Sequence, residues 1–79
     1  MTSDQRAQIS TALARYGAGL SGDFIAKGDK VLPVSFEVKK NRLRVMGGSE
    51  RLLASYPVSR IGTDVSDFVE KFWYWKPIR

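Results

Sequence analysis

The stretch LPVSFEVKKNRLRV, residues 32–45, carries the clearest structural pattern in the chain. Apolar and polar side chains alternate over residues 32–39, and the alternation resumes over residues 42–46 after the pair Lys40-Asn41. A period of two residues is that of a strand with one buried face. The stretch therefore predicts an antiparallel β-hairpin, with Lys40 and Asn41 at its tip.

This tip position sets the register of the predicted hairpin. Side chains facing one another across the two strands contribute to the stability of a sheet, and opposite charges pair favourably. The expected pairs are Val38 with Leu43 and Phe36 with Val45 on the buried side, and Glu37 with Arg44 on the exposed side. Pro33 lacks an N–H group, so we expect it at the start of its strand or on a sheet edge.

A helix is predicted before the hairpin, over residues 2–16. Thr2 and Gln5 fit a capping box, and apolar residues recur at helical spacing from Ile9 onward. The helix should end near Gly17 or Gly19. Residues 17–22 spell G-x-G-x-x-G, but a dinucleotide site needs a strand before this motif and a helix after it. We therefore interpret these residues as a helix cap and a connection.

After the hairpin, residues 50–58 fit either a third strand or a short helix, and the strand is slightly favoured. In the strand interpretation, one face carries Leu52, Ala54, Tyr56 and Val58.

A second helix is predicted over residues 63–75, capped by Thr63 or Asp64. Its apolar stripe, expected to face the core, consists of Val65, Phe68, Val69 and Phe72. The 79 residues thus predict one compact domain of the α+β class in the order α-β-β-β-α. Both helices are expected to pack on one face of a small antiparallel sheet.

The net charge of +5 is concentrated in one segment, because residues 39–51 alone contribute +4. The cations there are Lys39, Lys40, Arg42, Arg44 and Arg51. A basic patch attracts anionic partners, either nucleic acid or an acidic protein surface. A merely solvated hairpin tip is the alternative interpretation.

The predicted second helix ends in four consecutive aromatic residues, Phe72 to Trp75. Four successive residues cover most of a helix circumference, so a small core cannot bury all of them. Trp73 and Trp75 are expected at the margin of the core, and Tyr74 on the exposed face. Tyr74 and Trp75 are therefore candidate partner-binding residues, and a homodimer through this aromatic end is one possibility beside a monomer.

Histidine and cysteine are both absent, which removes the commonest acid–base group and the thiolate nucleophile. Asp64, Asp67 and Glu70 lie along one helix side, but capping and solvation explain them better than a metal does. We therefore expect no enzymatic activity, no cofactor and no metal. No apolar run of membrane-spanning length and no signal peptide is evident, so we expect a cytoplasmic protein.

The element order α-β-β-β-α resembles that of double-stranded RNA-binding domains, which would make the chain a nucleic-acid-binding module. That family begins its second helix with lysines that contact phosphates, whereas this chain has Asp64 and Asp67 there. A single-strand binder that combines the basic hairpin with aromatic residues is a related alternative.

The format of the whole chain, a single short domain that lacks cysteine and catalytic motifs, resembles the small inhibitors that phages and mobile elements encode, anti-CRISPR proteins in particular. The resemblance implies an inhibitor that binds a CRISPR effector complex and blocks target DNA recognition. The hairpin cations would meet acidic residues of the effector or phosphates of guide or target, and the exposed aromatics would provide the anchor. This is the favoured function, and nucleic-acid binding is the alternative.

Overall fold

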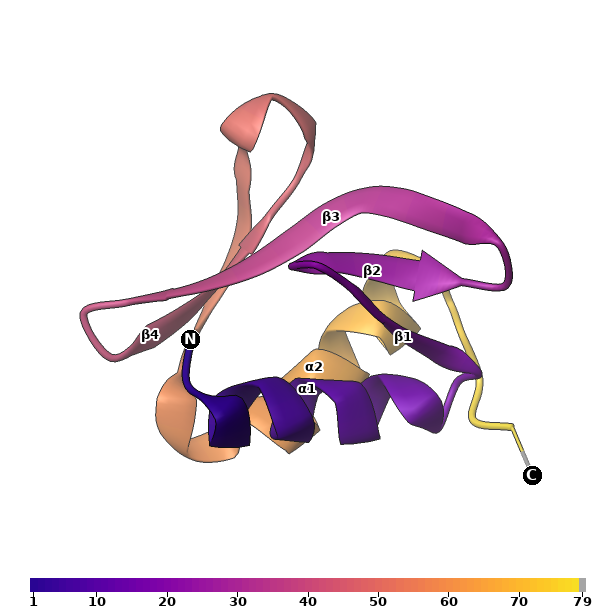
Figure 1. Ribbon diagram of the computed structural model, residues 1–79, viewed down its shortest axis with the longest axis horizontal. Helices are drawn as coiled ribbons and strands as arrows, with labels where there is room; N and C mark the ends of the chain where they lie inside the picture. The colour runs from indigo at the N-terminus through magenta and orange to yellow at the C-terminus, as the bar shows by residue number, and fades with distance from the viewer. Residues whose placement is uncertain (79) are drawn as a thin grey trace.

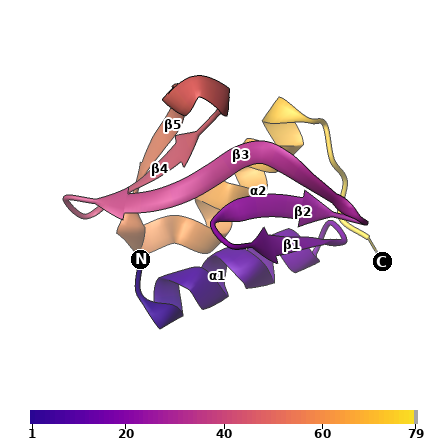
Figure 2. The same cartoon turned by 45° about the horizontal axis from the view of Figure 1, so that its top comes forward.

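The computed structural model describes residues 1–78 and has the predicted α+β class. Five antiparallel strands form one sheet in chain order, and the two α-helices lie together on one of its faces (Figures 1 and 2). The elements are α1 (Ser3–Ala14), β1 (Ala18–Ser21), β2 (Phe24–Lys27), β3 (Lys30–Lys39), β4 (Arg42–Met46), β5 (Leu52–Pro57) and α2 (Ile61–Phe72). Short 3-10 turns occupy Gly48–Glu50 and Val58–Arg60.

The register predicted for the central hairpin is confirmed. Cross-strand partners are Phe36 with Val45, Glu37 with Arg44, and Val38 with Leu43. Lys40 and Asn41 form the two-residue tip with φ angles of 53° and 60°. Positive φ at both positions is typical of the type I′ turn, whose twist matches that of the strands it joins.

The sheet has two more strands than expected, because residues 18–27 form the β1–β2 hairpin. The sequence predicted a connection over residues 17–22, and for Phe24 and Ile25 it left a helical turn and a short strand as alternatives; the structure has the strand. The predicted end of α1 is confirmed, since Gly17 has a φ of 72° and its N–H donates to the Ala14 carbonyl over 3.1 Å. Strands of only four residues, one of which contains Gly19, have too little alternation to be recognised locally. Their neighbours in the sheet supply the stability that the local pattern lacks.

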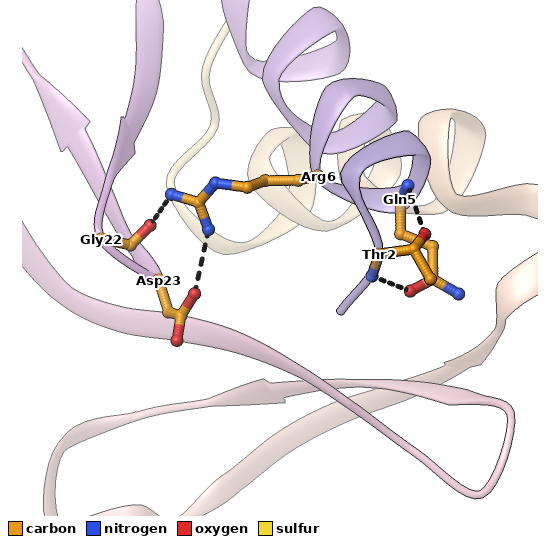
Figure 3. A network of polar contacts seen from close by, with 5 residues as sticks. All are labelled: Thr2, Gln5, Arg6, Gly22 and Asp23. Atoms are coloured by element: carbon orange, nitrogen blue, oxygen red, sulfur yellow. Dashed lines mark hydrogen bonds and ion pairs between the residues drawn. The ribbon is translucent and has the colours of Figure 1, made fainter.

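Arg6 joins the β1–β2 turn to α1. Its guanidinium donates to the Gly22 carbonyl and, over 3.0 Å, to Asp23 Oδ1 (Figure 3). The same view shows the predicted capping box, in which the Gln5 N–H donates to Thr2 Oγ1 and the Thr2 N–H donates to Gln5 Oε1. The turn on which the unexpected strands depend is thus held by a contact distant in sequence.

Pro33 lies inside the ten-residue strand β3 rather than at its start. The pairing with β2 jumps here, from Phe24 opposite Ser35 to Ala26 opposite Val31, and the pairing with β4 begins only at Ser35. Pro33 therefore lies in an irregular stretch that is an edge on its β4 side, a position where a missing N–H is tolerated.

Residues 52–57 form a strand, as favoured, but the expected face is wrong for Leu52, and Val58 lies beyond the strand in the second 3-10 turn. Val45 pairs with Ala54 and Met46 with Leu52, so Leu53 is the extra residue of a β-bulge. The bulge reverses the alternation, and Leu52 points away from the core with 48% of its surface exposed. Ala54 and Tyr56 still pack against the core.

The predicted bounds of α2 are wrong at both ends. The helix begins at Ile61, where it follows a 3-10 turn directly and has no side-chain cap, so neither Thr63 nor Asp64 is the N-cap. Ile61 is fully buried, and this burial draws the helix start two residues earlier than the polar signals indicated. At the other end, Trp73 already has non-helical angles, and Phe72, which we expected in the core, is 44% exposed.

The core lies between the sheet and the helix pair. Both strands of the central hairpin contribute the side chains expected from the alternation, and α2 contributes its predicted stripe apart from Phe72. The core residues are Ile9, Ala12, Leu13, Tyr16, Ile25, Val34, Phe36, Leu43, Val45, Ile61, Val65, Phe68 and Val69. Within residues 1–78, no α-helix covers the opposite face of the sheet (Figure 1), and we call it the outer face.

Candidate functional site

The cations of the β3–β4 hairpin have different local partners. Lys39 and Lys40 are exposed at the tip, and neither forms an ion pair with any residue from 1 to 78. Arg42 is held against β5, because its Nε and one terminal nitrogen donate to Ser55 Oγ and to the Ser55 carbonyl, each over 3.1 Å. Arg44 pairs with Glu37 at 3.5 Å, so its charge is largely compensated. The basic tip therefore consists of Lys39, Lys40 and Arg42.

Arg51 does not belong to this basic tip. It follows the turn at the other end of β4, which is five residues long. At roughly 3.3 Å per residue, the length of β4 places the two turns about 15 Å or more apart. The charge cluster seen in the sequence thus divides into a tip and one separate cation.

Tyr74 and Trp75 lie still farther from the basic tip. Lys27 Nζ lies 4.2 Å from the centroid of the Trp75 ring, which places this tryptophan beside the β2–β3 turn. The ten residues of β3 separate that turn from Lys39, a distance of roughly 30 Å at 3.3 Å per residue. In Figure 1 the tip and the C-terminal segment accordingly lie at opposite ends of the longest axis. The seven residues predicted to bind a partner do not form one surface.

The aromatic end serves mainly to close the core. Trp75 is half-buried and stacks on Trp73, with ring centroids 4.8 Å apart, and both pack at the core margin as expected. The following segment is anchored to the C-cap of α1, because the Ile78 N–H donates to the Arg15 carbonyl over 2.7 Å. Tyr74 alone is strongly exposed, at 82%, and it lies outside the helix with a φ of 59°. The helical placement from which its exposure was predicted is therefore wrong, although the side chain is exposed.

The outer face carries an apolar group that the sequence did not reveal. Its exposed members include Phe24 at 46% and Val31 at 58%, together with Leu52, which the bulge turns outward. Pro33 and Met46 lie among them on the two central strands. The alternation in β3 and β4 predicted which residues point outward. Phe24 depends on strand β2, which the sequence left open against a helical turn, and Leu52 depends on a bulge.

A hollow of about 640 Å³ opens on this face, lined by residues of β2, β3 and β4 and by the turn between β4 and β5. Its residues are Phe24, Pro33, Ser35, Glu37, Arg44, Met46 and 47–50. Glu37 and Glu50 supply two carboxylates against one guanidinium, so the hollow has a local charge of −1. Ser49 and Glu50 lie in the wall of the hollow and have φ angles of 62° and 57°. This left-handed backbone conformation is unfavourable for most residues other than glycine. We call this feature the outer hollow.

A small polar cluster lies between the C-terminal end of α1 and helix α2. The buried Tyr16 hydroxyl donates to Glu70 Oε2, and Ser66 is buried beside it. Burial and then the Glu70 hydrogen bond raise the pKa of Tyr16, which stays a neutral phenol. Burial also raises the pKa of Tyr56, helped by the carboxylates of Asp64 and Asp67. Both shifts favour the neutral side chain, and neither tyrosine lies in the outer hollow.

Between residues 1 and 78, no cluster of three or more carboxylate side chains has the arrangement of a metal site. Over the same range, no helix combines the length and the apolar character needed to cross a membrane. Comparison with protein-family models, with curated proteins and with solved structures finds no match to this chain.

Proposed function

We propose that this protein is a non-enzymatic inhibitor that binds a CRISPR effector complex in the cytoplasm and blocks its recognition of target DNA. The observation that carries the proposal is the basic tip, where two lysines that have no ion-pair partner within residues 1–78 stand on a well-defined hairpin. The proposal also rests on the chain's short, single-domain format and its lack of histidine and cysteine.

The tip is preorganised for binding an anion. Its type I′ turn fixes the backbone, and the two hydrogen bonds from Arg42 to Ser55 fix one of its side chains before any partner arrives. Preorganisation lowers the conformational entropy lost on binding. An effector offers suitable anions, because the guide and target strands carry phosphates within its nucleic-acid channel and acidic side chains are mostly exposed on protein surfaces. Occupying that region would prevent the target duplex from entering.

The test is an electrophoretic mobility shift of target DNA by purified effector complexes of several types, with and without this protein. The informative variant is Lys39→Glu/Lys40→Glu. Its matched control is Lys30→Glu/Lys76→Glu, which changes the net charge equally at exposed positions away from the tip. We expect the wild type and the control to abolish the DNA shift of at least one effector and the tip variant to lose at least tenfold in potency. Equal potency of tip variant and control would refute the role of the tip.

Nucleic-acid binding is the second candidate, and the same three tip cations favour it. If Lys39, Lys40 and Arg42 each neutralise one phosphate, affinity for duplex DNA should fall about 40-fold between 50 and 200 mM salt. A salt titration by fluorescence anisotropy with labelled single-stranded and double-stranded oligonucleotides measures this fall. Absence of binding at low salt would eliminate this candidate while leaving the inhibitor proposal intact.

A further inference from the structure

We propose that the outer hollow is a binding site for an arginine side chain that a partner protein presents. This inference goes beyond the proposed function and does not rest on it, because the hollow and the basic tip have opposite local charges. The hollow receives a cation, whereas the proposed function requires the tip to meet an anion.

The shape of the hollow follows from a row of residues that face one another across β2, β3 and β4. Phe24 pairs with Ser35, and Ser35 pairs with Met46, so the three side chains lie on the same face of the sheet. Two strand spacings, roughly 10 Å, separate Phe24 from Met46. Ser35 is a small residue between two large ones, so the row is low at its centre. The volume of about 640 Å³ lies within the range of roughly 300–1,000 Å³ that is usual for ligand sites.

The apolar lining of the hollow includes an exposed aromatic ring. Phe24, Pro33 and Met46 are its apolar residues, and Phe24 is 46% exposed. An arginine side chain matches such a surface, because its methylene stem covers apolar groups and its planar guanidinium stacks on aromatic rings. An anion gains nothing from the ring, since the face of a phenyl group carries negative partial charge. The lining therefore favours a cation.

The carboxylate of Glu50 supplies the opposite charge for this cation. Glu37 and Arg44 compensate each other at 3.5 Å, which leaves Glu50 as the uncompensated charge of the hollow. No residue from 1 to 78 forms an ion pair with Glu50. A carboxylate accepts two parallel hydrogen bonds from one guanidinium, a geometry that an ammonium group does not provide. The hollow therefore fits arginine better than lysine.

The turn that carries Glu50 is strained. Ser49 and Glu50 both have left-handed φ angles, which cost free energy in residues other than glycine. Backbone strain of this kind concentrates at sites that bind ligands, where the surrounding structure fixes a residue in advance. The strained pair forms the part of the wall that bears the uncompensated carboxylate.

The net charge of +5 does not prevent a cation from binding in the hollow. Lys40, in the basic tip, lies three residues from Glu37, a distance of about 10 Å along the strand. The Debye length at physiological salt is about 8 Å, so the charges of the tip are largely screened at the hollow. The local charge of the hollow decides which ligand it attracts.

The test is an NMR titration of the isolated, isotope-labelled protein with N-acetyl-arginine N-methylamide. Its control is the citrulline analogue, which has the same shape without the positive charge. We expect saturable shifts at the backbone amides of Phe24, Ser35 and residues 46–50, and binding about tenfold weaker or more for the citrulline analogue. The lysine analogue should also bind more weakly than the arginine one. Because the effector is absent from this experiment, its failure leaves the inhibitor proposal standing.

Two substitutions locate the site. Glu50→Gln removes the charge, and Phe24→Leu removes the aromatic face while keeping an apolar side chain, so each should weaken binding about threefold or more. Asp4→Asn is the matched control, because it removes one exposed carboxylate from α1, on the other side of the sheet, and should leave the affinity unchanged. Circular dichroism checks that each variant is folded.

Four results would overturn the inference. They are the absence of saturable shifts in the wild type, shifts confined to residues outside the hollow, binding of the citrulline or lysine analogue as tight as that of the arginine one, and unchanged affinity in both Glu50→Gln and Phe24→Leu.

Discussion

Replacing Tyr16 with phenylalanine removes a single hydroxyl from the contact between the two helices. The Tyr16 ring is fully buried, and its hydroxyl donates to Glu70, so the substitution deletes the hydrogen bond and leaves the ring in place. A hydrogen bond to a charged acceptor contributes about 1.5–3 kcal/mol. Glu70 is exposed and can return to water, so the loss should lie at the lower end, about 1.5 kcal/mol. For a domain of this size that corresponds to a fall in Tm of about 6–12 °C.

The same substitution should change the pH dependence of stability. The folded protein keeps Tyr16 neutral to a higher pH than the unfolded chain does, because burial and Glu70 raise its pKa above the ordinary value of 10.0. As the pH rises through the ordinary value of 10.0, Tyr16 loses its proton in the unfolded chain before it does so in the folded protein. The stabilisation that is present below pH 10 is therefore progressively lost. The Tyr16→Phe variant should show a shallower alkaline decline than the wild type. Part of the decline should remain, because the pKa of Tyr56 is raised as well.

Urea unfolding followed by circular dichroism, at neutral pH and at several alkaline values, measures both effects. Tyr74→Phe is the matched control, since it removes a tyrosine hydroxyl from a strongly exposed side chain. It should leave the free energy of unfolding unchanged at neutral pH. A Tyr16→Phe variant as stable as that control, or with the same alkaline decline as the wild type, would refute the reasoning.

Three other substitutions test the fold by urea or thermal unfolding. Ile61→Ala should lower the free energy of unfolding by about 2–5 kcal/mol, because it leaves a cavity at a fully buried position in the first turn of α2. A loss below about 1 kcal/mol, which is typical of a surface site, would contradict the account of why α2 starts early. Thr2→Ala should cost about 1 kcal/mol by removing the acceptor of the capping box, and Thr2→Ser, which keeps that acceptor, should cost clearly less. Ser49→Gly should stabilise by about 1 kcal/mol, because it relieves a positive φ; an unchanged midpoint would show that this turn is not strained.

Local patterns determined those parts of the fold in which each residue's environment follows from its near neighbours. The alternation over residues 32–45 predicted the register of β3 and β4, and Thr2 with Gln5 predicted the start of α1. The apolar stripe predicted which side of α2 is buried, apart from Phe72. The exposure of Lys39 and Lys40 was likewise evident, since a charged tip of a hairpin lies in water.

Tertiary structure alone decided the features on which the candidate sites depend. Phe24 reaches the outer face because β2 pairs with the first half of β3, and Leu52 reaches it because of the bulge at Leu53. Arg51, which belongs to the same basic segment of the sequence as the basic tip, is separated from it by the length of β4. These outcomes are not local. Strand pairing, bulges and the burial of Ile61 minimise the free energy of the whole packed chain, and no window of neighbouring residues contains that information.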